Sequence, residues 1–157
     1  MKAVLQRVLR ASVIADGKQA GSTKNGFLIL LGVGKEDTEE DALLLANKIA
    51  AFRVFSDENG KMNLALKDVG GEVLIVSNFT LYASYSHGNR PDFLQSAPPD
   101  EANRLYEYFV SLMKERVPTV QTGVFGADMQ ITMEADGPIT VVMESDKLKK
   151  GKKQSNA

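Results

Sequence analysis

The sequence contains no cysteine and only one histidine, His87. The absence of cysteine excludes disulfides, a thiol nucleophile and thiolate metal ligands. One histidine without cysteine cannot build a zinc centre rich in these ligands. Acidic side chains are abundant, but no loop shows the spacing of acids that a Ca²⁺ or Mg²⁺ site needs. We therefore expect neither a metal nor a cofactor.

Long apolar runs are also absent, and no stretch approaches the ~20 apolar residues of a membrane-spanning helix. The first residues, Met1 to Arg7, become charged too soon for a signal peptide. We therefore expect a cytoplasmic protein with no membrane contact.

Positive charge is scarce outside the last eleven residues. The chain has 19 basic and 20 acidic residues, and five of the lysines lie within 147–157. Residues 1–146 thus hold 14 basic and 20 acidic residues, a net charge of −6. A general nucleic-acid binder is basic overall, so this balance argues against one. We expect one domain over 1–146 and a disordered lysine-rich tail over 147–157.

Alternation and turn signals predict strands in the first third of the chain. Residues 2–14 alternate imperfectly between apolar and polar, which predicts a long strand with a possible bulge. Asp16-Gly17 is a hairpin signal, so a return strand is expected over 18–23. The continuous apolar run 27–33 predicts a strand that is buried on both faces.

Two helices and several further strands complete the predicted domain. One helix begins at Asp37 or Thr38, and the second runs from Asp100 to about Met113. The order of elements favours an α+β domain with a mostly antiparallel sheet that curls into a barrel-like structure. Several strands lack a polar face, and a homodimer is the commonest cover for such a surface. The further strands are expected at 54–55, 72–76, 120–125, 129–133 and 139–144.

The dipeptide Gly137-Pro138 stands between the last two predicted strands. Proline cannot donate to a sheet ladder, so it must lie at a turn, an edge or a special site. Taken alone, the dipeptide favours a simple hairpin turn. The alternative is a turn that pushes bare main-chain carbonyls outward, with no side chain in the way.

Hydroxyl side chains follow a predicted buried strand in the segment 77–81. Ser77 and Thr80 can act as nucleophiles, as proton shuttles or as turn-formers, and turns are the commonest use. The only histidine, His87, lies in the polar loop 83–99, where we expect it to be solvated. A Ser-His-Asp mechanism is therefore not expected. Any hydrolysis must use main-chain N–H groups, ordered water or a group of the substrate.

Several short motifs, each weak alone, form a strong signal by their order and spacing along the chain. They are Gln6-Arg7-Val8 with Arg10-Ala11-Ser12-Val13, Lys61-Met62-Asn63, Ser77-Asn78-Phe79-Thr80-Leu81, Gly88-Asn89-Arg90-Pro91-Asp92-Phe93, Thr122 to Met129, and Ala135-Asp136-Gly137-Pro138-Ile139-Thr140. Through these motifs the chain resembles the D-aminoacyl-tRNA deacylases from Met1 to about Met143. Three positions depart from the family pattern: Asn78 stands for glutamine, Asp92 for serine and Ala135 for asparagine. These departures bear on rate and substrate preference more than on the fold.

The resemblance implies a hydrolase that cleaves the ester at the 3′ end of D-aminoacyl-tRNA, and of glycyl-tRNA mischarged on tRNA-Ala. It implies a homodimer in which a cis Gly137-Pro138 from each subunit enters the other active site and rejects L-aminoacyl esters. The implied catalytic residues are Ser77, Phe79 and Thr80, the last two through their N–H groups at the oxyanion. The remaining implied residues are Asn78, Ala135, Gly137, Pro138 and Thr140 for substrate binding and chiral selection, and Arg7 and Arg90 for tRNA.

Two alternatives remain open at this stage. Gly137-Pro138, which the resemblance implies rejects L-aminoacyl esters, is called the selector below. Ala135, close to it in the sequence, is compatible with a deacylase for a small mischarged L-amino acid. Asn78 and Asp92 are compatible with an RNA-end binding module that has lost catalysis.

Overall fold

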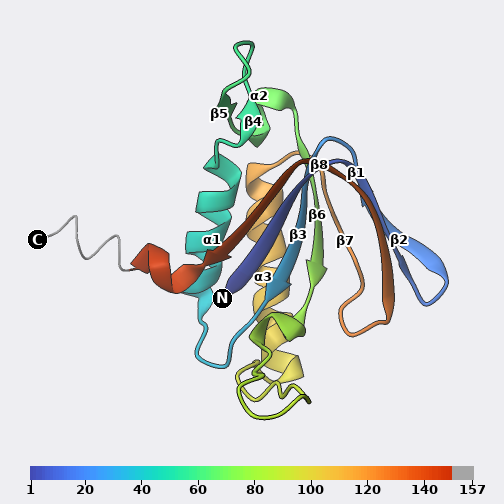
Figure 1. Ribbon diagram of the computed structural model, residues 1–157, viewed down its shortest axis with the longest axis vertical. Coiled ribbons are helices and arrows are strands. Elements are labelled where there is room, and N and C mark those ends of the chain that lie inside the picture. Colours follow the sequence, from blue (N-terminus) through green and yellow to red (C-terminus); the bar gives the residue numbers. More distant parts are fainter. Residues whose placement is uncertain (150–157) are drawn as a thin grey trace, which may run out of the picture.

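Two long helices lie side by side on one face of a curled six-stranded sheet in the computed structural model, which describes residues 1–149 (Figure 1). The elements are β1 (Lys2–Ala15), β2 (Lys18–Thr23), β3 (Gly26–Gly32), α1 (Glu39–Ala51), β4 (Phe55–Ser56), β5 (Met62–Leu64), α2 (Leu66–Val69), β6 (Glu72–Ser77), η1 (Phe79–Tyr82), α3 (Pro99–Arg116), β7 (Val120–Thr122) and β8 (Met129–Glu144).

The sheet is mixed, with three antiparallel and two parallel strand pairs, so the expected antiparallel majority is accompanied by parallel pairs that were not predicted. Strand β1 is antiparallel to β2, β3 and β8, whereas β3–β6 and β6–β7 are parallel pairs. The parallel pairs arise because a helix stands between the strands of each pair along the chain. The sheet nearly closes on itself where Ser22 N–H donates to Gln121 Oε1 at 2.8 Å. The α+β class and the barrel-like curl are confirmed.

Local signals placed the first hairpin and the long helices correctly. Asp16 and Gly17 have φ of 49° and 80°, as a two-residue hairpin turn requires. Helix α1 begins after Thr38, whose N–H donates to Asp41 Oδ2 at 2.8 Å. Helix α3 extends beyond its predicted bounds at both ends. The short elements β5, α2 and η1 were not predicted, because three or four residues show no periodicity.

Two hydrophobic cores result from the curl of the sheet. The larger core lies between the sheet and the helices and includes Ile75, Leu105 and Phe109. The smaller core lies within the curl and includes Leu28 and Leu74. Strands β3 and β6 contribute to both cores, which explains why their sequences are apolar throughout.

Strand β8 is continuous, so the hairpin-turn interpretation of Gly137-Pro138 is wrong. Ala135 pairs with Val8 and Thr140 pairs with Gln6, which leaves residues 136–139 opposite Arg7 alone. Gly137-Pro138 therefore lies in a large β-bulge, exposed, and its peptide bond is cis as the resemblance implied. Gly137 has φ of 125°, a conformation that favours glycine.

The end of the described chain is partly ordered. Residues 145–149 are helical, and Leu148 packs against the larger core. Lys149 Nζ lies 2.9 Å from Asp41 Oδ1. The expected disordered tail is therefore wrong for residues 147–149, and the rest of it lies outside the described residues.

Candidate active site

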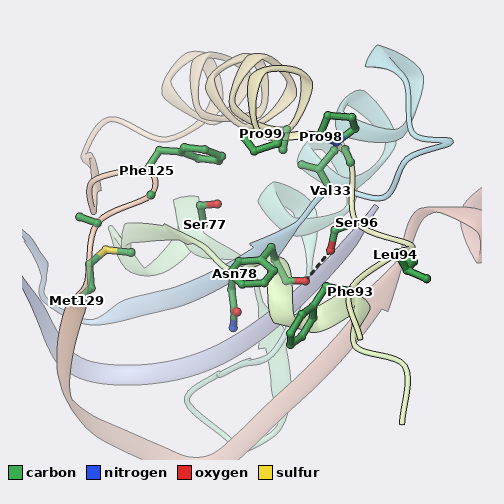
Figure 2. A pocket seen from close by; sticks show the side chains of 15 residues that line it. Val33, Ser77, Asn78, Phe93, Leu94, Ser96, Pro98, Pro99, Phe125 and Met129 are labelled. Atoms are coloured by element: carbon green, nitrogen blue, oxygen red, sulfur yellow. Dashed lines mark hydrogen bonds between the residues drawn. The ribbon is translucent and has the colours of Figure 1, made fainter. Parts of the chain in front are cut away.

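A cavity of about 670 Å³ opens where β6 ends, and Figure 2 shows the side chains around it. Its walls come from β6 and η1, from the segment before α3, and from the connection between β7 and β8. Most of its lining is apolar. The lining residues are Val33, Ser77, Asn78, Phe79, Phe93, Leu94, Ser96, Ala97, Pro98, Pro99, Ala102, Phe125, Gly126, Ala127 and Met129.

The short helix η1 is held at the edge of this cavity by the end of β3. Asn78 N–H donates to Leu31 O at 2.8 Å. A Cβ on Gly34 would lie 2.7 Å from Tyr82 Cε1, so glycine is needed for η1 to approach. The Tyr82 hydroxyl donates to Asp37 Oδ2 at 3.2 Å. Burial, together with Asp37, raises the pKa of Tyr82 well above its usual range, so this bond persists at neutral pH.

Asn78 caps η1 with its side chain. Its Oδ1 accepts hydrogen bonds from the Thr80 N–H at 3.2 Å and from Thr80 Oγ1 at 2.5 Å. Asparagine suits this position because its short side chain reaches the N–H two residues ahead. The Thr80 N–H is therefore engaged within η1 and does not stand free for a substrate, contrary to expectation.

Phe79 lines the cavity with a main-chain N–H that has no partner. Among residues 1–149, no hydrogen bond uses the Phe79 N–H. The peptide units on both sides of this residue are held by their carbonyls, since Asn78 O accepts from the Leu81 N–H at 3.4 Å and Phe79 O accepts from Ser96 Oγ at 3.0 Å (Figure 2). Phe79 is 57% exposed, and its ring meets Phe93 edge-to-face, with the ring centroids 4.9 Å apart. A fixed N–H without a partner is what an oxyanion donor requires.

The structure brings some of the predicted site residues to the cavity and leaves others outside it. Of the predicted catalytic residues, Ser77 and Phe79 line the cavity, and Thr80 follows directly on η1. Of the five residues predicted for substrate binding and chiral selection, only Asn78 lines the cavity of its own chain. The other four lie on the exposed part of β8 and are Ala135, Gly137, Pro138 and Thr140.

The bulge in β8 is tied down by β1. Arg7 Nε lies 3.1 Å from Asp136 Oδ2, and Arg7 Nη1 donates to Val54 O at 2.7 Å. Thr140 Oγ1 donates to Gln6 Oε1 at 2.7 Å. Arg7 is buried and its guanidinium contacts these protein groups, so little of it is accessible to bind RNA. Arg90 is exposed in the loop 83–98.

The residues that form the far wall of the cavity were not predicted as site residues from the sequence. Phe125 and Met129 flank the connection between β7 and β8, and Pro98 and Pro99 begin α3. The match over Thr122 to Met129 was a usable signal for the first pair. Within residues 1–149, no three acidic or histidine side chains are grouped to hold a metal, and no helix is long and apolar enough to cross a membrane.

Comparison with solved structures shows that this fold occurs in other proteins. A structure titled as a probable eukaryotic D-amino acid tRNA deacylase shares the fold, with a TM-score of 0.79 at 15% identity over 91% of this chain and 98% of that one. Another, titled c-Myc DNA Unwinding Element Binding Protein, is 39% identical, with a TM-score of 0.86 over 92% of this chain and 98% of that one. The fold of this chain is therefore the fold of both proteins.

Sequence comparison then identifies the family. The model of the D-Tyr-tRNA(Tyr) deacylase family matches residues 4–144. D-aminoacyl-tRNA deacylases from Thermotoga petrophila and Thermosipho africanus are 51% and 53% identical, each over 94% of this chain and 99% of the relative. The chain belongs to the D-Tyr-tRNA(Tyr) deacylase family and is a hydrolase that acts on aminoacyl-tRNA.

Proposed function

We propose that the enzyme hydrolyses the ester of D-aminoacyl-tRNA, and of glycyl-tRNA mischarged on tRNA-Ala, at the cavity beside η1. A water oxygen adds to the ester carbonyl carbon, and the bond from that carbon to the ribose oxygen breaks. The ribose oxygen takes up a proton, and the products are free amino acid and tRNA. The observation that carries this proposal is the free Phe79 N–H at the rim of an apolar cavity.

The Phe79 N–H stabilises the negative charge that develops on the carbonyl oxygen. Removing such a donor typically costs about 10²–10³ in rate. Ser77 lines the same cavity and orients the attacking water. The 2′-hydroxyl of the terminal ribose assists, which makes the reaction depend on RNA. An aminoacyl ester is already activated, so this modest machinery suffices without a histidine base.

Chiral selection is assigned to Gly137-Pro138 of a second subunit. The selector lies outside the cavity of its own chain, so a composite site needs another copy. Strand β8 supplies a surface for that copy, because it is an edge strand on which Ile131, Met133 and Val142 are 39%, 43% and 60% exposed. Long exposed edges of this kind are normally covered, and a two-fold dimer covers both copies.

The selector works by exclusion. Rigid main-chain atoms close to the substrate α-carbon leave no room for the β-carbon of an L-amino acid, whereas a D side chain points outward. In this scheme two residues of β1 hold the bulge in place, Arg7 beside Asp136 and Gln6, which accepts from Thr140 Oγ1. Asn78 shapes η1 and does not contact the amino acid.

Contact with the tRNA is confined to its 3′ end, because residues 1–146 carry a net charge of −6. Arg90, exposed on the loop beside the cavity, is assigned to that contact. The same negative charge argues against duplex DNA as a ligand, because the phosphate backbone of DNA is itself negative. A tRNA substrate places the enzyme in the cytoplasm.

Hydrolysis of matched D-Tyr-tRNA and L-Tyr-tRNA by the wild type and by Pro138→Ala tests the proposal. The wild type should cleave only the D ester, and the variant should gain cleavage of the L ester. Equal cleavage of both esters by the wild type would overturn the proposal. Faster cleavage of L-Ala-tRNA than of D-Tyr-tRNA would point to a deacylase for small L-amino acids. Stable D-Tyr-tRNA in excess enzyme would point to a binding module.

A further inference from the structure

A second cavity, of about 470 Å³, lies beside the first, and Phe125 lines both. It is bounded by one side of α3 and by the end of β7 with the residues that follow it. Its lining mixes apolar and polar side chains. The lining residues are Asn103, Tyr106, Glu107, Val110, Ser111, Lys114, Thr122, Gly123, Val124 and Phe125.

The polar side chains around this second cavity divide into two groups. Tyr106 and Ser111 are satisfied within the protein, since they donate to Ile75 O at 3.0 Å and to Tyr108 O at 2.6 Å. Within residues 1–149, the side chains of the other four form neither a hydrogen bond nor an ion pair, and these are Asn103, Glu107, Lys114 and Thr122.

The other two cations of α3 already have partners within the protein. Arg104 pairs with Glu39 at 2.9 Å and with Glu101 at 2.7 Å. Arg116 donates to Asn47 Oδ1 at 2.9 Å and to Leu112 O at 2.7 Å. Lys114 is therefore the α3 cation whose charge remains available to bind an external anion at this cavity.

We propose that the second cavity binds the nucleotide that precedes the terminal adenosine of the aminoacyl-tRNA. The inference rests on the proposed function, which places the ester at Phe79. The terminal nucleoside then fills the apolar part of the first cavity towards Phe125, and the preceding nucleotide emerges on the far side of that ring. The half-exposed Phe125, which packs on Tyr106 with ring centroids 5.9 Å apart, forms the shared wall.

The chemistry of the cavity suits one unpaired nucleotide. Lys114 attracts the phosphodiester, and Val124 with Phe125 offers an apolar surface to the base. Glu107 accepts hydrogen bonds from an exocyclic amine or a ribose hydroxyl, and Asn103 both donates and accepts. An apolar platform, a cation and such polar groups are the usual components of sites for single-stranded nucleic acid.

The test compares two small esters, D-tyrosyl-adenosine and the D-tyrosyl ester of the dinucleotide cytidylyl-adenosine, with the full D-Tyr-tRNA. For the wild type, kcat/KM for the dinucleotide ester should exceed that for the adenosine ester by about tenfold, the equivalent of ~1.4 kcal/mol. Lys114→Glu and Asn103→Ala should remove most of this advantage and leave cleavage of the adenosine ester unchanged. Lys67→Glu on α2, which lines neither cavity, is the charge-matched control and should keep the advantage.

Equal kcat/KM for the two small esters in the wild type would overturn the inference, and so would an advantage that survives both variants. The L-tyrosyl esters of the same three compounds, assayed alongside, reveal failure of the proposed function separately, because the wild type would then show no preference for any D ester over its L counterpart.

Discussion

Arg7 Nε and Asp136 Oδ2 lie 3.1 Å apart, across the first of the two places where the register between β1 and β8 shifts. The same guanidinium donates to Val54 O, in the segment that follows α1. The bulge that carries Gly137-Pro138 is thus tied through one side chain to two other parts of the fold. This connection supports the proposal that the exposed Gly137-Pro138 segment discriminates by shape, because it restrains the backbone of that segment.

Asp136→Asn should weaken chiral discrimination with little loss of stability. The substitution keeps the size of the side chain but removes the charge that faces Arg7. We expect the ratio of D-Tyr-tRNA to L-Tyr-tRNA cleavage to fall about tenfold. The Asp136 side chain is 37% exposed and so is screened by solvent, and its pairing with Arg7 contributes only ~0–1 kcal/mol to folding. Asp16→Asn, in the β1–β2 turn, is the matched control and should leave the ratio unchanged. An unchanged ratio in Asp136→Asn would refute this role.

Asn78→Ala should lower kcat more than it raises KM. Loss of the cap, worth ~1 kcal/mol in typical helices, frees η1 to move and misplaces the Phe79 N–H. We expect kcat to fall at least tenfold and at most by the ~10²–10³ that removal of an oxyanion donor costs. Asn78→Ser retains a capping oxygen and should recover most of the rate in steady-state assays. Equal losses in both variants would exclude a capping role.

Thr80→Ala should remain active. The Thr80 hydroxyl donates to Asn78 Oδ1 and shapes η1, so it is not available as an obligatory nucleophile. We expect a loss in kcat of about tenfold or less, since a single hydrogen bond contributes ~0.5–1.5 kcal/mol. A folded variant that binds D-aminoacyl-tRNA but shows no turnover would require us to abandon this assignment.

Mixed dimers should show that the selector acts on the partner's cavity. We combine one subunit carrying Pro138→Ala with another carrying Ala127→Trp, which fills its own cavity. The only open cavity then faces a wild-type Pro138 from the other subunit. The purified heterodimer should therefore reject L-Tyr-tRNA as the wild type does, in contrast to the Pro138→Ala homodimer. Persistent L cleavage by the heterodimer would place the selector in the cavity of its own chain.

Asp41 should make the fold sensitive to acid. Burial opposes its ionisation, but hydrogen bonds from Ser145, Lys149 and the Thr38 N–H lower the pKa of Asp41 from 3.8 to about 2. The stabilisation from this buried carboxylate is therefore fully present above pH 3.8 and is lost as the pH falls through about 2.

The size of this contribution follows from the pKa difference and is about 2 kcal/mol. Denaturant unfolding at pH 6 and at pH 2 should show the wild type losing this amount beyond what Asp41→Asn loses. Asp128→Asn, at an exposed position, should behave as the wild type. An identical acid response in Asp41→Asn would contradict the prediction.

Short-range chemistry in the sequence was enough for much of the fold. The turn at Asp16-Gly17, the cap before α1 and the buried strand over 27–33 each depend on residues that are close along the chain. Hydroxyl and amide groups at the end of β6 could likewise be placed beside a site, because a buried strand must end at a surface.

The tertiary structure alone decided which distant segments meet. The bulge in β8 forms where the pairing between β8 and β1 changes register. The paired residues there lie more than 120 positions apart along the chain, and no local pattern encodes that shift. Arg7 is buried for the same reason, and Phe125 and Met129 reach the cavity only because the sheet curls. Local propensities act within a few residues, whereas register and closure follow from burying both cores at once.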